Sequence, residues 1–294
     1  MQEIVDIMER LASREGANET AVNGVHLFRR SENIHRTPLL YKQGVIIMGQ
    51  GAKKVHLGNQ VYEYDQDHYL VLTVPLPAEC EAEVVDGKPL LSLMVDIDMR
   101  ILNSVIQQMD DWDESSYSVS ENKCPGLYRS QATPEFKETV LRLLRTLESP
   151  VKSRVLGEGL VRELLFRILC GENAASLHAL ALKNTGLSRI DKALKQIHSN
   201  FDQPFQVDQL AGFVNMSTSA FHRSFKGVTS LSPIQYLKKV RLNRAKSLIV
   251  EEGVRSGDAA RMVGYESVSQ FNREFKRYFG ASPRGLLMMN SRTA

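Results

Sequence analysis

The last third of the sequence repeats itself at an offset of 50 residues, and this repeat limits the possible folds more than any other feature. Residues 217–226 are Ser-Thr-Ser-Ala-Phe-His-Arg-Ser-Phe-Lys, and residues 267–276 are Ser-Val-Ser-Gln-Phe-Asn-Arg-Glu-Phe-Lys. Six residues after each copy comes Ser-Pro, at 232–233 and again at 282–283. Eight identities at one fixed offset predict that one structural unit occurs twice.

Each copy has the pattern of an amphipathic helix. Phe221 and Phe225 are four residues apart, as are Phe271 and Phe275, so each pair lies on one face and is predicted to be buried. The opposite face carries small polar groups and two cations. Cations bind phosphate or the edge of guanine, and asparagine pairs with adenine. The residues predicted to contact DNA are Thr218, Ser219, His222, Arg223, Lys226, Ser269, Gln270, Asn272, Arg273 and Lys276.

A shorter helical segment precedes each copy, at 207–214 and at 258–263. Gly264 lies in the turn of the second pair. A short helix, a tight turn and a cationic helix make a helix-turn-helix motif. Two such motifs are therefore predicted, at about 207–226 and 257–277.

Capping signals support these helices. Each copy begins with a serine at the N-cap position, and Ser267 with Gln270 forms a predicted capping box. A second box, Ser232 with Gln235, opens a long helix predicted at 234–250.

These residues give the chain a family resemblance. Residues 190–287 resemble the DNA-binding domain of the AraC/XylS transcriptional regulators. The resemblance implies two helix-turn-helix units joined by the long helix, with recognition helices at 217–226 and 267–276. The family usually has glycine near Ser230 and Tyr-Arg near Leu287-Met288, and this chain has neither. Beyond the repeat, the matching residues are Leu210-Ala211, Arg241-Leu242, Ala245, Ala260, Gly264-Tyr265 and Gly280.

The first part of the chain has a different pattern. Short segments rich in β-branched and aromatic residues alternate with turn signals, which predicts a small all-β barrel or sandwich. The stretch Tyr41–Tyr64 contains Gln50-Gly51-x-Lys53-Lys54-Val55-x-Leu57-Gly58, followed by Tyr62-x-Tyr64-Asp65. It is similar to the cupin-like sensor barrel of a subgroup of the same regulators. The predicted strands are 45–48, 61–64, 68–74 and 90–97, and the predicted turns are Gly58-Asn59, 65–67, Pro75-Leu76-Pro77 and Asp86-Gly87.

Helical periodicity surrounds this barrel, at 4–11, 99–109 and in two helices within 134–170. Polar residues at 110–120 predict a loop, and a linker is predicted near 184–186. The leucine stripe at 141–147 fits a core and a dimer interface equally well, and together with the stripe at 160–168 it is a candidate surface for the pairing of two chains.

The predicted class is therefore α+β, with two domains. Residues 1–182 form a sensor and dimerisation domain, with a cupin-like barrel at about 20–97 and helices at about 98–182. Residues 183–294 form an all-α DNA-binding domain.

Charge separates the two domains. Residues 183–294 contain 18 lysines and arginines against 8 aspartates and glutamates, a net charge of +10, whereas residues 1–182 have 19 against 26, or −7. A basic C-terminal domain points to a polyanionic partner, double-stranded DNA.

Cysteine usage fits a reducing compartment. Cys80, Cys124 and Cys170 are odd in number, far apart and without metal-ligand spacing. The N-terminus lacks the pattern of a secretory signal, and no apolar stretch approaches about 20 residues, so we expect a cytoplasmic protein without a membrane partner.

Several single residues carry weaker signals. Lys226 and Lys276 are interpreted as phosphate contacts, while His222 fits a DNA contact and a spectator equally well. Arg241 is interpreted as part of an internal ion pair. His56, Glu63 and His68 lack the His-x-His spacing of cupin metal sites, so we predict no metal there and no cofactor.

The preferred function is a sequence-specific transcription regulator controlled by an unknown small-molecule effector in the N-terminal domain. It is predicted to act as a homodimer on asymmetric promoter sites, with RNA polymerase as a further partner. An enzyme is disfavoured because the sequence contains no catalytic motif. A non-specific architectural DNA binder is also disfavoured, because it would have lysines without a regular spacing and no sensor domain. The sequence does not identify the effector, the promoter, the dimer interface or the sign of regulation.

Overall fold

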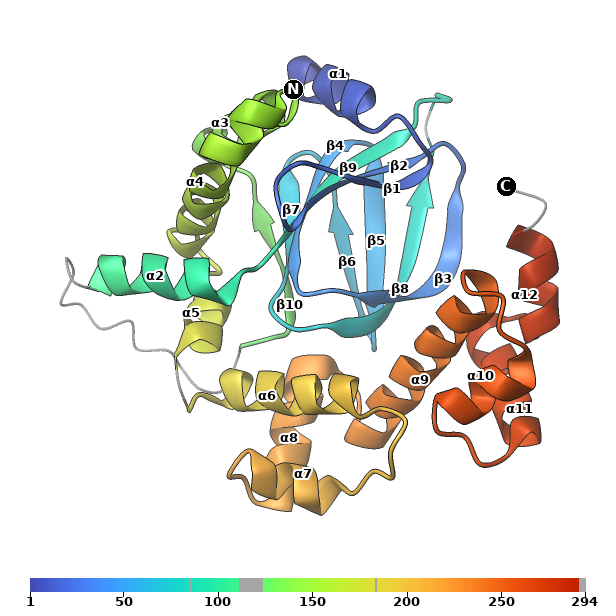
Figure 1. Ribbon diagram of the computed structural model, residues 1–294. Coiled ribbons are helices and arrows are strands. Elements are labelled where there is room, and N and C mark those ends of the chain that lie inside the picture. The colour runs from blue at the N-terminus through green and yellow to red at the C-terminus, as the bar shows by residue number, and fades with distance from the viewer. Residues whose placement is uncertain (85, 111–123, 183, 291–294) are drawn as a thin grey trace.

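The computed structural model describes residues 1–84, 86–110, 124–182 and 184–290. Figure 1 shows a β-sandwich flanked by helices, followed by a group of short helices that lies at one end of the sandwich. The predicted α+β class is confirmed. The strands are β1 (Gly16–Glu19), β2 (Val25–Arg30), β3 (Ile34–Tyr41), β4 (Gly44–Gln50), β5 (Ala52–Leu57), β6 (Gln60–Tyr64), β7 (His68–Leu72), β8 (Leu76–Glu83), β9 (Leu90–Asp96) and β10 (Leu127–Gln131).

The strands form two sheets, with the orders β1-β2-β9-β4-β7-β10 and β3-β8-β5-β6. Neighbouring strands pair antiparallel throughout. Strand β7 has β4 on one side and β10 on the other, so its sequence neighbour β6 stays in the second sheet. Among the described residues no strand pairs across the two sheets, and the predicted barrel is an open sandwich.

The predicted strands correspond to β4, β6, β7 and β9, while the pattern does not identify the others. The turns at Gly58-Asn59 and Asp86-Gly87 are confirmed by their position between consecutive strands. The turn predicted at Pro75-Leu76-Pro77 is wrong in its second half, because β8 begins at Leu76. Pro77 is tolerated there because β8 has only β3 as a neighbour at this position, and β5 joins it from Glu79 onward.

Helices cover the outer face of the larger sheet. The stacked rings of Tyr69 and Phe136, with centroids 4.3 Å apart, join β7 to α3. Thr133 is the N-cap of α3, since its hydroxyl accepts from the amide of Phe136. The helices of this part are α1 (Gln2–Leu11), α2 (Met99–Asp110), α3 (Pro134–Leu147), α4 (Pro150–Leu169) and α5 (Ala175–Ala181). The loop predicted at 110–120 lies outside the described residues, apart from Asp110, which ends α2.

Both leucine stripes belong to the core. Their side chains are buried except that of Leu141, which is half-buried. The alternative of a dimer interface built from these stripes is therefore wrong, because their apolar surface is already packed against the rest of the chain.

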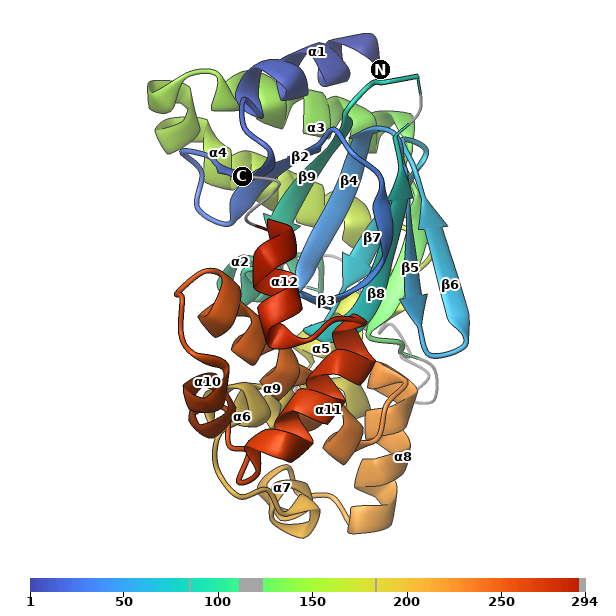
Figure 2. The same ribbon diagram turned by 90° about the vertical axis from the view of Figure 1, so that its right-hand side faces the viewer.

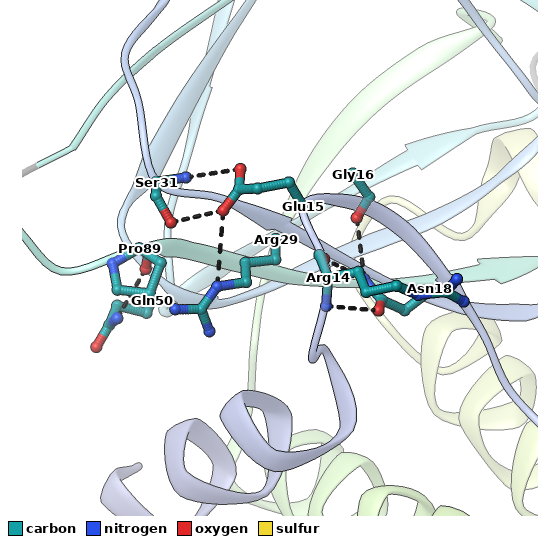
Figure 3. A network of polar contacts seen from close by, with 8 residues as sticks. All are labelled: Arg14, Glu15, Gly16, Asn18, Arg29, Ser31, Gln50 and Pro89. Carbon is teal, nitrogen blue, oxygen red and sulfur yellow. Dashed lines mark hydrogen bonds and ion pairs between the residues drawn. The ribbon is translucent and has the colours of Figure 1, made fainter. Parts of the chain in front are cut away.

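The segment between α1 and β2 is fixed by side-chain contacts at the edge of the sandwich (Figure 3). Asn18 binds the backbone of Arg14 at both its amide and its carbonyl group. Glu15 accepts from the hydroxyl of Ser31 at 2.6 Å and lies 3.7 Å from Arg29. These contacts attach β1 as the first edge strand of the larger sheet.

The remaining helices lie below the sandwich in Figure 2, except that α12 extends upward beside it, and α9 is the longest of them with 18 residues. They are α6 (Gly186–Ser199), α7 (Val207–Phe213), α8 (Thr218–Thr229), α9 (Pro233–Val250), α10 (Ser256–Met262), α11 (Val268–Phe279) and α12 (Pro283–Asn290). The capping box of Ser232 and Gln235 at the start of α9 is confirmed.

The hydrophobic core divides within α9. One cluster runs from the sandwich through α6, α7 and α8 to Val240. A second, smaller cluster starts at Leu242 and contains α10 and α11. The first helix-turn-helix unit therefore shares its core with the sandwich, whereas the second has a core of its own.

We expect Phe275→Ala to destabilise the protein by about 3–5 kcal/mol, because the ring is fully buried and its loss leaves a cavity. Phe213→Ala is the control, since this ring is 59% exposed and its removal leaves no cavity. Chemical denaturation of both variants measures the difference. Equal stabilities would show that the ring of Phe275 does not support the core.

Candidate nucleic-acid interface

The first helix-turn-helix unit consists of α7 and α8. Ser217 caps α8 by accepting from the amide of Ala220, as predicted. Asn215 takes the left-handed conformation in the turn, at φ 54°. The hydroxyl of Thr218 donates to Asp208 at 2.8 Å, which ties α8 to α7. This predicted contact residue thus also positions the recognition helix.

The second unit consists of α10 and α11. Ser267 caps α11, but the predicted capping box is only half formed. The side chain of Gln270 turns along the helix and donates to Glu274 at 3.2 Å instead of returning to the N-cap amide. Donation from the Gln270 amide group to an ionised carboxylate is a charge-assisted hydrogen bond, which favours this side-chain position.

The two recognition helices end in the same way. Ser230 follows α8 at φ 58° and Gly280 follows α11 at φ 75°, both left-handed and 50 residues apart. The glycine that the family usually has near Ser230 therefore corresponds to a position that needs positive φ, and serine occupies it here at a conformational cost.

The phenylalanine pairs mark the same buried face on both recognition helices. Phe221 and Phe225 have ring centroids 5.4 Å apart with planes at 54°, and Phe271 and Phe275 have the same values. All four rings are fully buried. Because the rings fix the inner face of each helix, the opposite face of each helix points to solvent.

That outer face carries the residues predicted to contact DNA, and all ten are exposed. The side chains of Arg223 and Lys226 on α8, and of Arg273 and Lys276 on α11, form no hydrogen bond or ion pair with any residue that the structure describes. Four cations without internal partners leave their donors available to phosphate oxygens or base edges.

Arg241 lies in the middle of α9 and joins the two units. Its guanidinium group donates to the carbonyl oxygens of Phe201 at 2.6 Å, Gln203 at 2.9 Å and Gly264 at 2.9 Å. The internal role predicted for Arg241 is confirmed, but its partners are backbone carbonyls rather than a carboxylate. Burial lowers the pKa of this guanidinium group from its usual value.

Gly264 makes this joint possible. It has φ 82°, and a Cβ atom there would lie 2.4 Å from the carbonyl oxygen of Asp202. The turn of the second unit thus packs directly against the loop between α6 and α7.

Glu274 is a functional residue that the sequence patterns missed. It accepts from Lys238 of α9 at 3.0 Å and from the hydroxyl of Tyr265 at 2.9 Å, besides Gln270. Burial opposes ionisation, but these hydrogen bonds prevail and lower the pKa of Glu274. Comparison of the two copies of the repeat points to this position, because Glu274 in the second copy replaces Ser224 in the first.

The residues considered for a metal site do not form one cluster in the sandwich. His56 Nε2 lies 2.9 Å from Glu81, Glu63 pairs with Lys54 and His68 pairs with Asp65. Within the described ranges no group of three or more metal-ligating side chains occurs. In the same residues, no helix combines the length and apolarity that a membrane crossing requires.

Comparison with known proteins identifies the family. Residues 21–176 match the model of the AraC-type transcriptional regulator N-terminus, and residues 210–288 match a helix-turn-helix domain model. The first match covers more than half of the chain, and the protein belongs to the AraC-type transcriptional regulators.

Curated relatives match part of the chain. The regulator GbdR of Pseudomonas aeruginosa is 29% identical over 100 residues, which are 34% of this chain and 27% of that protein. The activator RhaS of Escherichia coli is 28% identical over 150 residues, 51% of this chain and 53% of that protein. The matched region thus spans about a quarter to a half of these relatives.

A solved structure extends the likeness to most of the chain. The wild-type ToxT of Vibrio cholerae, crystallised with an unsaturated fatty acid, superposes with a TM-score of 0.59 over 90% of this chain and 94% of that chain. The sequence identity is 11%, so the likeness concerns the fold.

We expect Arg241→Met to destabilise the protein by about 2–4 kcal/mol, because three carbonyl groups lose a charged donor. Arg244→Met on the same helix is the matched control. Arg244 is exposed and pairs only with Glu252, so its loss should cost less than about 1 kcal/mol. Urea denaturation measures both, and a similar small loss in the two variants would contradict the joint.

Proposed function

We propose that this chain is a sequence-specific DNA-binding transcription regulator that inserts α8 and α11 into two successive major grooves. The observation that carries the proposal is that each of two helix-turn-helix units exposes a cationic helix face opposite a buried pair of phenylalanines. Because α9 and not a symmetry axis relates the units, one chain binds an asymmetric site with contacts about 10 bp apart.

The proposed contacts divide into two kinds. Arg223, Arg273 and Asn272 contact base edges, together with Ser219, Ser269, His222 and Gln270. Lys226 and Lys276 contact phosphates, which positions the helices without adding sequence information. Residues 183–294 form the DNA-binding domain, and residues 1–182 form the domain that senses an effector and pairs two chains.

A direct connection supports control by the sandwich. The hydroxyl of Tyr236 in α9 donates to the carbonyl oxygen of Pro75 at 2.7 Å and lies 2.8 Å from His198 Nε2. Gly126 donates its amide to Val228 of α8 at 3.1 Å. A ligand in the first domain thus has physical routes to the first recognition helix. ToxT, with its bound fatty acid, is a fold neighbour that holds a small molecule.

Pairing of two chains is proposed to use the exposed face of α4. Val151 and Val155 are 73% and 72% exposed, and Leu156 is 50% exposed. Val151 and Val155 lie one turn apart on α4 and Leu156 follows Val155 directly, and such an apolar patch marks an interaction surface. We place the protein in the cytoplasm, propose that it acts by binding and not by catalysis, and expect RNA polymerase as a further partner.

Arg223→Ala and Arg273→Ala should each weaken binding to the cognate site by about 1–3 kcal/mol, the range for a contact with a base edge. Arg244→Ala removes the same charge away from the recognition helices and serves as the control. Fluorescence anisotropy with cognate and scrambled duplexes at one salt concentration measures specific and non-specific binding. Retention of full specificity by both variants would show that the helices face the wrong way.

Lys276→Ala should weaken cognate and scrambled duplexes alike. The slope of log affinity against log salt should fall by about one unit, because one phosphate contact is lost. A loss confined to the cognate duplex would instead assign Lys276 to base recognition.

Val155→Glu should convert a dimer to monomers in sedimentation and remove the gain in affinity on a double site, because it places a charge in the apolar patch. Val61→Glu is the control, since Val61 is 52% exposed on β6 and lies outside the patch. A wild-type protein that sediments as a monomer on its own and on the double site would refute the pairing.

A further inference from the structure

Lys53 is a lysine at a core position of the sandwich. It lies in the middle of the alternation of β5, where Val55 and Leu57 also point inward and Lys54 points outward. Its side chain is buried, with the whole residue 8% exposed. Lysine is almost never buried to this extent without a partner of opposite charge.

No carboxylate accompanies this amine among the described residues. Lys53 Nζ lies 3.3 Å from the hydroxyl oxygen of Ser92 and 4.5 Å from the ring centroid of Phe28. Phe28 and Ser92 are cross-strand partners on β2 and β9, so the larger sheet supplies both contacts. The outward neighbour Lys54, in contrast, pairs with Glu63 at 3.0 Å.

Further donors lie around the amine on the smaller sheet. Tyr64 is the cross-strand partner of Lys53 on β6, and its hydroxyl lies with that of Tyr41 and with the thiol of Cys80. All three side chains are buried, and neither hydroxyl forms a hydrogen bond of normal geometry. An ammonium, three hydroxyls and a thiol thus meet between the sheets without an anionic acceptor.

We propose that this cluster binds the carboxylate of a small organic acid. The carboxylate supplies the missing negative charge and several acceptor lone pairs. Aliphatic and aromatic side chains, including Met48, Val55 and Phe28, surround the donors, so the remainder of the ligand is apolar. The inference rests on the proposed function in one respect, because it gives the chemical class of the effector.

Binding should be coupled to protonation of the lysine. Burial lowers the pKa of Lys53 to about 8, with Cys80 acting in the opposite direction. A bound carboxylate favours the ammonium form and raises this pKa. Binding above pH 8 should therefore take up protons, and affinity should fall as the pH rises further. Cys80 is the titratable group that acts on the amine, and Tyr41 and Tyr64 lie beside its thiol.

Calorimetric titration of the full-length protein tests the site, with hexanoate and benzoate as probes and hexanamide and benzamide as uncharged counterparts. We expect the acids to bind at least about tenfold more tightly than the amides, with proton uptake at pH 8.5 when buffers of different ionisation enthalpy are compared. Equal affinities, or no binding of either acid at about 10 mM, would overturn the proposal.

Two variants and a control locate the contact. Lys53→Met should abolish the preference for the acids and the proton uptake, while the unliganded protein stays as stable or becomes more stable because a buried charge is removed. Tyr64→Phe should weaken the acids several-fold, which tests the site independently if Lys53→Met does not fold. Lys54→Met should change neither result. Unchanged acid binding in Lys53→Met would refute the assignment.

DNA binding is measured on the same samples, so the two proposals fail separately. Cognate binding without any acid binding overturns only the carboxylate site. Acid binding that depends on Lys53, without sequence-specific DNA binding, overturns the proposed function and leaves the site in place.

Discussion

The guanidinium group of Arg241 is the contact on which the arrangement of the two helix-turn-helix units depends. Its three hydrogen bonds reach the loop after α6 and the turn before α11, which lie 40 and 23 residues away along the chain. A planar guanidinium group spreads five donors over three nitrogen atoms and so reaches carbonyl groups on separate segments, whereas lysine has three donors on a single nitrogen atom. Glu274 adds a second link through Lys238, so α9 holds α11 at two places.

The hydrophobic core divides the chain at a different place from its charge. Charge separates a basic C-terminal part from an acidic N-terminal part, yet apolar packing continues from the sandwich into α6, α7 and α8. Gly126 and Gly58 permit the close approach, because a Cβ atom at Gly126 would lie 2.6 Å from the carbonyl oxygen of Val228. The first recognition helix is therefore supported by the sandwich, and the second by α9 and its own core.

The sequence predicted the helical repeat well because its signals are local. The contacts of Phe221, Ser217 and the capping box at Ser232 lie within one or two helical turns. The spacing of residues in the sequence therefore predicts them directly. The contacts of Arg241 and the two-sheet arrangement depend on residues far apart in the chain, so no local pattern contains them. The sequence pattern did not predict that Lys53 is buried, because Lys53 and Lys54 are the same residue type. Only the pairing of β5 with β6 and β8 shows that Lys53 points inward and Lys54 outward.

Strand β8 connects the parts of the molecule that regulation has to couple. Cys80 lies in the donor cluster between the sheets, and the carbonyl of Pro75, next to the start of the strand, accepts from Tyr236 of α9. A ligand among the donors changes the DNA-binding helices only to the extent that it binds one arrangement of β8 more tightly than another. By reciprocity, DNA that selects an orientation of α9 changes the affinity for the ligand by the same factor. Because Tyr236 is buried and its hydroxyl bonds both Pro75 and His198, displacement of β8 leaves polar groups unpaired. This cost in free energy favours discrete positions of β8 over a continuous range of positions. A regulatory switch requires such discrete positions.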